Sequence, residues 1–226
     1  MTKKENKKNN KTGVMIVDDH PFVRYGISQL IGAAPDLEVC CEAGSYREAL
    51  EKLKESKPNL AIIDLSLKDV HGIELIKTIN RRYPAIPMLV LSMHDEFLYA
   101  ERSIRAGARG YVMKQEGTEI LITAIRRILS GHIFVSPDIS SKLIAKQSGH
   151  AYGPEMDSFE CLSDRELEVF ELLGNGHKTS RIAEALNLSV KTIETYRSNI
   201  KNKLGLSDSS ELLQKATLWV KSIEIP

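Results

Sequence analysis

The chain has 226 residues, of which 42% are hydrophobic and 27% are charged, and its formal net charge is +1. This composition is that of an ordinary globular protein, and the length favours two domains over one. No stretch approaches the roughly 20 apolar residues that a membrane span requires, and the polar amino-terminal segment lacks the apolar core of a secretory signal. We therefore expect a cytoplasmic protein.

The first twelve residues carry five lysines against a single acid, Glu5, and we expect residues 1–12 to be a disordered basic tail. From residue 13 to 133, five short apolar runs alternate with segments of helical period. The runs are 14–17, 38–41, 60–63, 88–91 and 110–113. This alternation predicts a parallel sheet covered on both faces. Five strands and five helices indicate a flavodoxin-like α/β domain with the strand order 2-1-3-4-5.

Three cysteines occur, Cys40, Cys41 and Cys161, and their spacing fits neither a disulfide framework nor a metal site. Successive residues of a strand point to opposite faces, so we expect Cys40 and Cys41 to point apart as reduced packing residues. The six histidines are scattered, and none forms a pair at ligand spacing. A structural metal site built from cysteine and histidine is therefore not expected.

Residues 134–158 mix serine, proline and glycine with one short apolar patch, which predicts a linker with a helical turn at 141–146. Residues 159–226 show only helical patterns and predict a domain of four helices. The first of these helices begins with a capping box formed by Ser163 and Glu166. The last has Asp208 and Glu211 as its expected capping pair.

Polar side chains follow four of the five predicted strands. Asp18 and Asp19 follow the first strand, Asp64 the third and Ser92 the fourth, and the fifth reaches Lys114. The carboxyl ends of parallel strands share one edge of the sheet, so these groups should converge there. A single acid at such a position is often only a helix cap. Compatible groups from four separate strands favour a shared site instead.

Three carboxylates in one place repel one another, since two unit charges at about 4 Å repel by about 4 kcal/mol at an effective dielectric of about 20. Either one carboxyl keeps its proton at a raised pKa, or a cation lies among them. A hard divalent ion with oxygen ligands, above all Mg²⁺, would meet this need. A central carboxylate beside Mg²⁺ and an ammonium can act as a nucleophile toward phosphorus.

The segments "VDDH", "IIDLSLKDVHG", "LSMH" and "GYVMK" resemble the signature segments of two-component receiver domains, over about 120 residues. The resemblance implies that Asp64 is the phosphoacceptor and that Asp19 binds Mg²⁺ directly, while Asp18 acts through water. It assigns the third protein ligand to the backbone carbonyl of Ser66.

The same resemblance implies that the hydroxyl of Ser92 turns toward the phosphoryl group, that Lys114 pairs with that group, and that Tyr111 is the aromatic that moves inward on activation. One residue departs from the usual pattern. Gln115 follows Lys114, where many receivers have a proline.

On a helical wheel, the segment 190–204 divides into two faces. The apolar face, expected to pack on neighbouring helices, consists of Val190, Ile193, Tyr196, Ile200 and Leu204. The opposite, polar face carries Lys191, Thr195, Ser198 and Asn202 and is flanked by Glu194 and Asn199. The basic residues of the segment, Lys191, Arg197, Lys201 and Lys203, concentrate positive charge where DNA phosphates would lie. The expected DNA contacts are Lys191, Glu194, Thr195, Arg197, Ser198, Lys201 and Asn202. A solvated amphipathic helix would show the same division. The short helix and turn before it, however, complete a helix-turn-helix whose polar face suits the DNA major groove.

The stretch from "LSDRELEVF" to "NIKNKLGL" is similar to the LuxR/NarL-type DNA-binding domain. By this resemblance, residues 190–204 form the recognition helix, and the last helix, about 208–222, carries a dimer contact. Many members of the family have lysine where Glu194 stands. Glu194 either accepts a hydrogen bond from a cytosine amino group or orients Arg197, so no base preference transfers.

Together the two resemblances imply a NarL/FixJ-class response regulator with a sensor histidine kinase, double-stranded promoter DNA and a second copy of itself as partners. Such a protein catalyses only its own phosphotransfer and autodephosphorylation. Two alternatives stay open: a DNA-binding regulator whose receiver works without phosphorylation, and an aspartate-nucleophile phosphatase. Such phosphatases usually place a general acid two residues after the nucleophile, where this chain has Ser66.

Overall fold

The computed structural model describes residues 11–68, 70–148 and 159–224. The chain forms two compact units that divide between Leu143 and Ile144, and each is described by itself. Most of the predicted basic tail, residues 1–10, and the segment 149–158 of the predicted linker lie outside the described residues.

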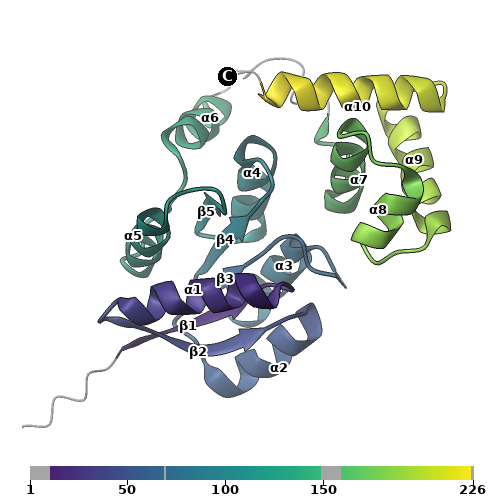
Figure 1. Cartoon of the computed structure of the whole chain (residues 1–226). Helices are drawn as coiled ribbons and strands as arrows, with labels where there is room; N and C mark the ends of the chain where they lie inside the picture. The colour runs from purple at the N-terminus through teal and green to yellow at the C-terminus, as the bar shows by residue number, and fades with distance from the viewer. Residues whose placement is uncertain (1–10, 69, 149–158, 225–226) are drawn as a thin grey trace, which may run out of the picture. The chain divides into compact units, whose positions relative to one another are not determined.

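The first unit is built on a five-stranded parallel sheet with the order β2-β1-β3-β4-β5 (Figure 1), which confirms the predicted topology. The strands are β1 (Thr12–Val17), β2 (Leu37–Ala43), β3 (Leu60–Ile63), β4 (Met88–Ser92) and β5 (Gly110–Met113). Every residue of β3 and β4 is buried, because a parallel sheet is covered on both faces.

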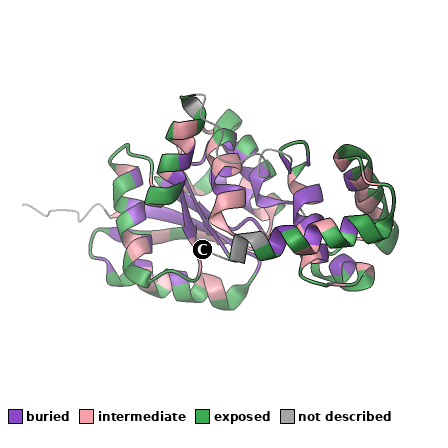
Figure 2. Ribbon diagram, turned by 90° about the horizontal axis from the view of Figure 1, so that it is seen from above, coloured by how far each residue is buried: buried purple, intermediate pink, exposed green. Residues whose placement is uncertain are grey.

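Five helices cover the two faces of the sheet. They are α1 (Pro21–Ala33), α2 (Tyr46–Ser56), α3 (Gly72–Arg82), α4 (Glu96–Ala106) and α5 (Thr118–Leu129). Helices α1 and α5 share one apolar cluster with alternate residues of the strands, including Val14 and Ile16. Helices α2, α3 and α4 lie on the other face (Figure 1). Figure 2 shows the strands as the buried centre of this unit, with the exposed faces of the helices outside.

Strand β2 contains an irregularity that the sequence does not reveal. Val39 pairs with Val14 of β1, but the next pair is Cys41 with Met15, so Cys40 is an extra residue in the ladder. The Sγ atoms of Cys40 and Cys41 lie 3.9 Å apart. The expectation that the two cysteines point apart is therefore wrong, because a β-bulge breaks the strict alternation of side chains.

A sixth helix, α6 (Pro137–Gln147), lies in the stretch that was expected to be a linker with a single helical turn. The ammonium of Lys142 is buried and donates a 2.8 Å hydrogen bond to the carbonyl of Phe97 in α4. This bond attaches the first turns of α6 to the first unit.

The second unit consists of α7 (Asp164–Gly174), α8 (Thr179–Ala185), α9 (Val190–Leu204) and α10 (Ser209–Glu224). The predicted capping box of Ser163 and Glu166 is present at the start of α7. Asp208 Oδ1 accepts hydrogen bonds from two backbone amides at the start of α10. The rings of Phe159, Phe170 and Trp219 lie 5.0–5.2 Å apart and form the aromatic centre of this unit.

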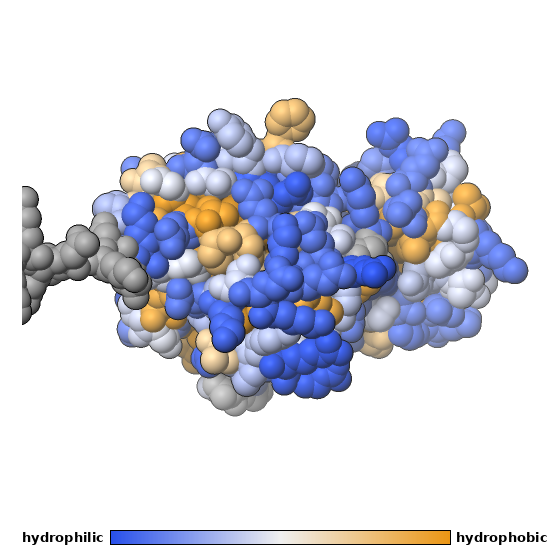
Figure 3. Space-filling view, turned by 90° about the horizontal axis from the view of Figure 1, so that it is seen from below, coloured by the Kyte–Doolittle hydropathy of each residue, from blue (hydrophilic) through white to orange (hydrophobic). Residues whose placement is uncertain are grey.

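The surface is mixed. On the face seen in Figure 3, hydrophobic residues form small patches separated by hydrophilic side chains. Large exposed apolar side chains include Phe22 and Tyr25 on α1 and Leu213 and Leu218 on α10. Within the described ranges, none of the helices combines the length and the hydropathy that crossing a membrane would take.

Candidate functional site

Three carboxylates gather at the carboxyl edge of the sheet. Val17 at the end of β1 lies opposite Ile63 at the end of β3, and the Asp64 amide donates a 2.8 Å hydrogen bond to the Val17 carbonyl. This register places Asp18 and Asp64, the next residue of each strand, side by side. Asp18, Asp19 and Asp64 are all buried, as expected for groups that strands from the interior deliver.

Lys114 closes this pocket from the end of β5. Its ammonium lies 2.7 Å from Asp18 Oδ2 and 2.8 Å from Asp64 Oδ2. Its backbone amide donates a 2.8 Å hydrogen bond to the Ser92 carbonyl at the end of β4. Four strands therefore bring together the groups that the sequence singled out. We name Asp18, Asp19, Asp64 and Lys114 the acidic pocket.

The charges in the acidic pocket do not balance. Burial raises the pKa of the Asp64 carboxyl, and the Lys114 ammonium offsets only part of that rise. Burial lowers the pKa of Lys114, but Asp64 and Asp18 raise it by more, so its pKa lies above the usual value. An excess of negative charge raises the pKa of acids and bases alike. The excess negative charge of the pocket would therefore stabilise a further bound cation.

The donor set of the pocket fits a hard divalent cation. One ligand atom each from Asp18, Asp19, His20 and Asp64 can be chosen within 4.8 Å of one another. Asp64 Oδ1 is buried and accepts no hydrogen bond of ordinary geometry from the described residues. Carboxylate oxygens are the ligands that Mg²⁺ prefers, and this set includes three carboxylates.

His20 and Lys68 are the groups near the pocket that the sequence reasoning missed. His20 Nδ1 lies 2.6 Å from Asp19 Oδ1, and its side chain is 62% exposed. The ammonium of Lys68 lies 3.8 Å from Asp19 Oδ2. His20 directly follows the acid pair in "VDDH", so its position in the sequence was a usable signal. Lys68 lies in a loop, where spacing gives no such signal.

Glycine is required behind Asp64. A side chain at Gly72 would collide with the backbone of Asp64 and Leu65. The Gly72 amide donates a 2.8 Å hydrogen bond to the Leu65 carbonyl, so α3 starts directly behind the loop that carries Asp64. The position of Asp64 is thus fixed by backbone contacts with the start of α3 as well as by the sheet.

Ser92, at the end of β4, and Tyr111, in β5, are both buried. Ser92 Oγ accepts a 3.2 Å hydrogen bond from the backbone amide of His94. The Tyr111 hydroxyl donates a 2.8 Å hydrogen bond to the carbonyl of the same residue. Ser66 Oγ and His94 Nε2 lie 3.0 Å apart. The loop at His94 therefore connects three of the predicted site residues, and Tyr111 occupies an inward position.

The polar face predicted on α9 is present. Lys191, Glu194, Thr195, Ser198 and Asn202 are exposed, while Ile193 and Ile200 are fully buried. Val190 was placed on the packing face, but it is 50% exposed. That expectation was wrong, because Val190 is the first residue of α9 and lies beyond the part of the helix that packs on its neighbours. Ser189 caps this end by accepting a 3.0 Å hydrogen bond from the Thr192 amide.

Arg197 orients the polar face of α9 relative to α8. Its Nη1 atom donates hydrogen bonds of 2.8 Å to Thr179 Oγ1 and of 2.8 Å to Glu194 Oε1. Asn187, in the turn between the two helices, takes a left-handed φ of 51°, a conformation that asparagine tolerates better than most residues. One polar contact and one special backbone position thus add to the packing of buried residues such as Ile182 and Ile193 in fixing the helix-turn-helix.

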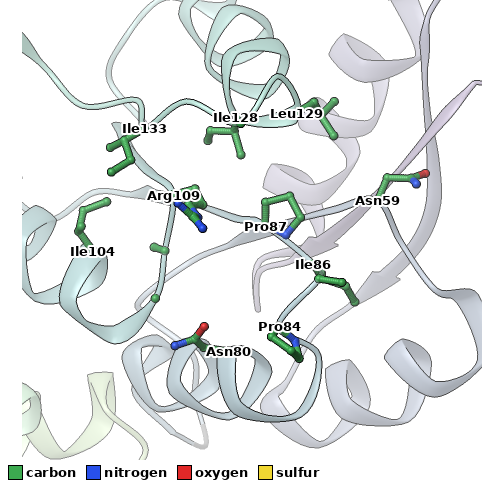
Figure 4. Close-up of a pocket in the computed structure, with 14 residues that line it drawn as sticks. Asn59, Asn80, Pro84, Ile86, Pro87, Ile104, Arg109, Ile128, Leu129 and Ile133 are labelled. Atoms are coloured by element: carbon green, nitrogen blue, oxygen red, sulfur yellow. The ribbon is translucent and has the colours of Figure 1, made fainter.

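A second hollow, of about 590 Å³, lies at the amino ends of β3, β4 and β5, at the edge of the sheet opposite the acidic pocket (Figure 4). Apolar side chains such as Ile104, Ile128 and Ile133 line much of it, together with Asn80 and Arg109. Its lining includes none of the site residues expected from the sequence.

The fold, the acidic pocket and the polar face of α9 define a class of protein: a doubly wound domain with an acidic site at the carboxyl edge of its sheet, joined to a helix-turn-helix unit. The family model described as the response regulator receiver domain matches residues 14–126. The model described as bacterial regulatory proteins of the luxR family matches residues 160–216. The chain therefore belongs to the response regulators of the NarL/FixJ class, which are transcriptional regulators with a receiver domain and a LuxR-type DNA-binding domain.

Individual relatives agree over most of their length. The oxygen regulatory protein NreC of Staphylococcus haemolyticus is 34% identical over 90% of this chain and 95% of its own. The transcriptional regulatory protein UhpA of Salmonella typhimurium is 36% identical over 89% and 96%. The structure of RcsB from Salmonella enterica serovar Typhimurium, bound to promoter rprA in the presence of phosphomimetic BeF3−, has 30% identity and a TM-score of 0.61, covering 92% of this chain and 99% of that one.

Proposed function

We propose that this protein is a transcriptional regulator whose binding to promoter DNA is controlled by a phosphoryl group on Asp64. One observation carries the proposal: Lys114 bridges Asp18 and Asp64 at 2.7 and 2.8 Å in a buried pocket with excess negative charge. A lysine in that place can neutralise an oxygen of a phosphoryl group held on Asp64.

In the proposed transfer, an Asp64 carboxylate oxygen forms a bond to phosphorus while the bond from phosphorus to the donor breaks. The donor nitrogen of a histidine kinase leaves with the electron pair of the broken bond. Asp18, Asp19, Asp64 and the carbonyl of Ser66 would hold Mg²⁺. When bound, the ion neutralises charge on the transferring oxygens. Hydrolysis of the acyl phosphate by water restores Asp64, so the chemistry stays confined to the protein itself.

The switch in this proposal involves Ser92, Lys114 and Tyr111. A phosphoryl dianion on Asp64 attracts the Ser92 hydroxyl and the Lys114 ammonium, and Tyr111 is held in its inward position beside the His94 loop. Inverting a 1:99 population takes about a 10⁴-fold difference in affinity, or about 5.5 kcal/mol. A single charge-assisted hydrogen bond to the phosphoryl group contributes less than this energy, so several such contacts must form together.

For DNA recognition, we propose that α9 enters the major groove. Its polar face would then contact the bases and phosphates through the side chains named above, with Lys191 and Lys201 at phosphates. The exposed Leu213 and Leu218 on α10 support a contact with a second copy of the chain. Two recognition helices would then meet half-sites about one helical turn apart. RcsB, which is bound to promoter DNA in its structure, supports the same arrangement here.

The proposal assigns residues 13–133 to the receiver, 134–158 to the linker and 159–226 to the DNA-binding domain. Helix α6 lies inside this linker, so part of it is helical. Promoter DNA as the target and a histidine kinase as the phosphoryl donor imply a cytoplasmic protein.

The test uses acetyl phosphate as the donor. With Mg²⁺ present, the full-length protein should gain one phosphoryl group and bind target DNA more tightly, whereas Asp64→Asn should gain none. Equal labelling of both would show that Asp64 is not the acceptor. Labelling of Asp64 with unchanged DNA binding would leave a DNA-binding regulator that ignores phosphorylation. Continuous release of phosphate from small phosphoesters would indicate a phosphatase.

A further inference from the structure

A pair of thiols on β2 has no part in the proposed switch. The extra residue at Cys40 sets the two Sγ atoms 3.9 Å apart. In a regular strand, adjacent side chains point to opposite faces and their ends lie far apart. The bulge therefore creates a contact that the sequence "CC" alone does not provide.

The neighbours of the pair show which way it points. Val39 packs against the cluster under α1 and α5, and the Glu42 carboxylate lies 3.5 Å from Arg24 of α1. The residues on both sides of the pair thus turn toward α1. Cys40 and Cys41, between them, both turn toward the opposite face of the sheet.

Gly13 of β1 makes room for the first thiol. A Cβ atom at Gly13 would lie 3.2 Å from Cys40 Cβ and 3.4 Å from Cys40 Sγ, which is tighter than most real contacts. Gly13 precedes Val14, which faces α1, so it lies on the same face as the two cysteines. Because Cys40 is exposed and Cys41 is partly exposed, a small ion can reach both sulfurs from solvent.

The spacing of the sulfurs suits coordination to one ion. With a zinc–thiolate bond of about 2.3 Å as the reference, two sulfurs on a tetrahedral ion lie roughly 3.8 Å apart. The observed separation of 3.9 Å is nearly twice a disulfide bond of about 2.05 Å. Soft thiolate ligands select soft ions over hard ones.

We propose that Cys40 and Cys41 form a two-thiol chelating site for a soft, thiophilic ion, such as Cd²⁺ or a monosubstituted trivalent arsenical. With an arsenic(III) oxide, two arsenic–sulfur bonds replace the bonds to oxygen, and the two thiol protons leave on that oxygen as water. Arsenic stays trivalent, so no oxidant is needed. With Cd²⁺, the two thiols release their protons to solvent as the ion binds.

The protonation of Cys40 disfavours its oxidation at neutral pH. Partial desolvation of the sulfur and the neighbouring Cys41 raise the pKa of Cys40 to about 11. Cys40 therefore keeps its proton near neutral pH and is a poor nucleophile. An ion that binds both sulfurs displaces both protons at once, and its affinity should rise with pH.

Phenylarsine oxide is the probe for the test, added to the reduced full-length protein without other thiols. One equivalent should lower the number of titratable thiols from three to one, because Cys161 is the third cysteine. Cys161→Ser should bind the probe as the wild type does. Cys40→Ser and Cys41→Ser should each bind it about 100-fold or more weakly, because chelation by the second thiol is lost.

Cd²⁺ gives an independent measurement through thiolate charge-transfer absorption, which should appear in wild type and be lost in both serine variants. Unchanged probe binding in Cys40→Ser would overturn the proposal. So would a protein that, isolated under air, is two mass units lighter and binds no probe, because the pair would then be a disulfide. Asp64→Asn should bind the probe normally, which separates this site from the phosphoacceptor.

Discussion

The acidic pocket and the polar face of α9 reach their positions by different routes. The pocket is assembled from the ends of three strands, β1, β3 and β5, whose places are set by backbone register, and its carboxylates are buried. The face of α9 comes from one helix, and most of its side chains are exposed. The chemistry of the pocket is therefore prescribed by the fold, whereas the specificity of the α9 face depends on individual side chains.

If the charged groups of the acidic pocket are tightly coupled, removing the Lys114 ammonium should have the largest effect on stability and on DNA binding. Lys114→Ala leaves the buried Asp18 and Asp64 without their shared partner. Breaking a buried ion pair costs about 3–5 kcal/mol, and phosphorylation-dependent DNA binding should be lost. Thermal unfolding followed by circular dichroism measures the loss, with Trp219 fluorescence reporting the second unit separately. Lys54→Ala, at an exposed site on α2, is the control and should change stability little. Equal effects of the two variants would contradict the coupling.

Mg²⁺ should stabilise the first unit, because it supplies the positive charge that the pocket lacks. At about 100 times the dissociation constant, a bound ion adds about 2.7 kcal/mol to the free energy of unfolding. Asp19→Asn should lose most of this gain, and Lys54→Ala should keep it. Titration calorimetry with MgCl₂ measures the binding directly. A gain that survives in Asp19→Asn would place the ion elsewhere.

On α9, variants should separate by the type of contact. Ser198→Ala should relax sequence preference at one base position, where a good contact discriminates by about 1–3 kcal/mol. Lys201→Ala should weaken binding to all sequences and lower the salt slope by about 1. DNA selections at two salt concentrations measure both effects, with Lys54→Ala as the unchanged control. If both α9 variants weakened binding uniformly, Ser198 would not contact a base.

The sequence predicted the parts of the molecule that follow regular periods. The strand order follows from five apolar runs alternating with helical segments, and the convergence of Asp18, Asp64 and Lys114 follows from the polar residues at the ends of four of those runs. The bulge at Cys40 was missed because one inserted residue leaves no trace in hydropathy. Helix α6 was reduced to a turn, since its attachment through Lys142 to the Phe97 carbonyl is a tertiary contact.

The smallest expected effect, on the stability of the second unit, concerns the contact between Glu166 of α7 and Lys203 of α9 rather than the polar face of α9. Glu166 Oε2 accepts hydrogen bonds of 2.7 Å from the Ser163 amide and of 2.6 Å from the Lys203 ammonium. Burial raises the pKa of Glu166, but these two hydrogen bonds lower it by more, so its pKa lies below the ordinary value of 4.5. A lowered pKa in the folded state stabilises the protein above pH 4.5, and the contribution is lost as pH falls through the folded-state value.

Glu166→Gln keeps an acceptor for the Ser163 amide but loses the charge that faces Lys203, so it should destabilise the second unit by up to about 1 kcal/mol near pH 7. The difference from wild type should shrink as the pH falls below 4.5, because wild-type Glu166 is then protonated as well. Urea unfolding followed by Trp219 fluorescence measures this, since Trp219 is the single tryptophan of the chain. A difference independent of pH would mean that Glu166 acts by packing alone. The polar face of α9 would then be held without an ionic link to α7, and its position would rest on Arg197 and the buried isoleucines.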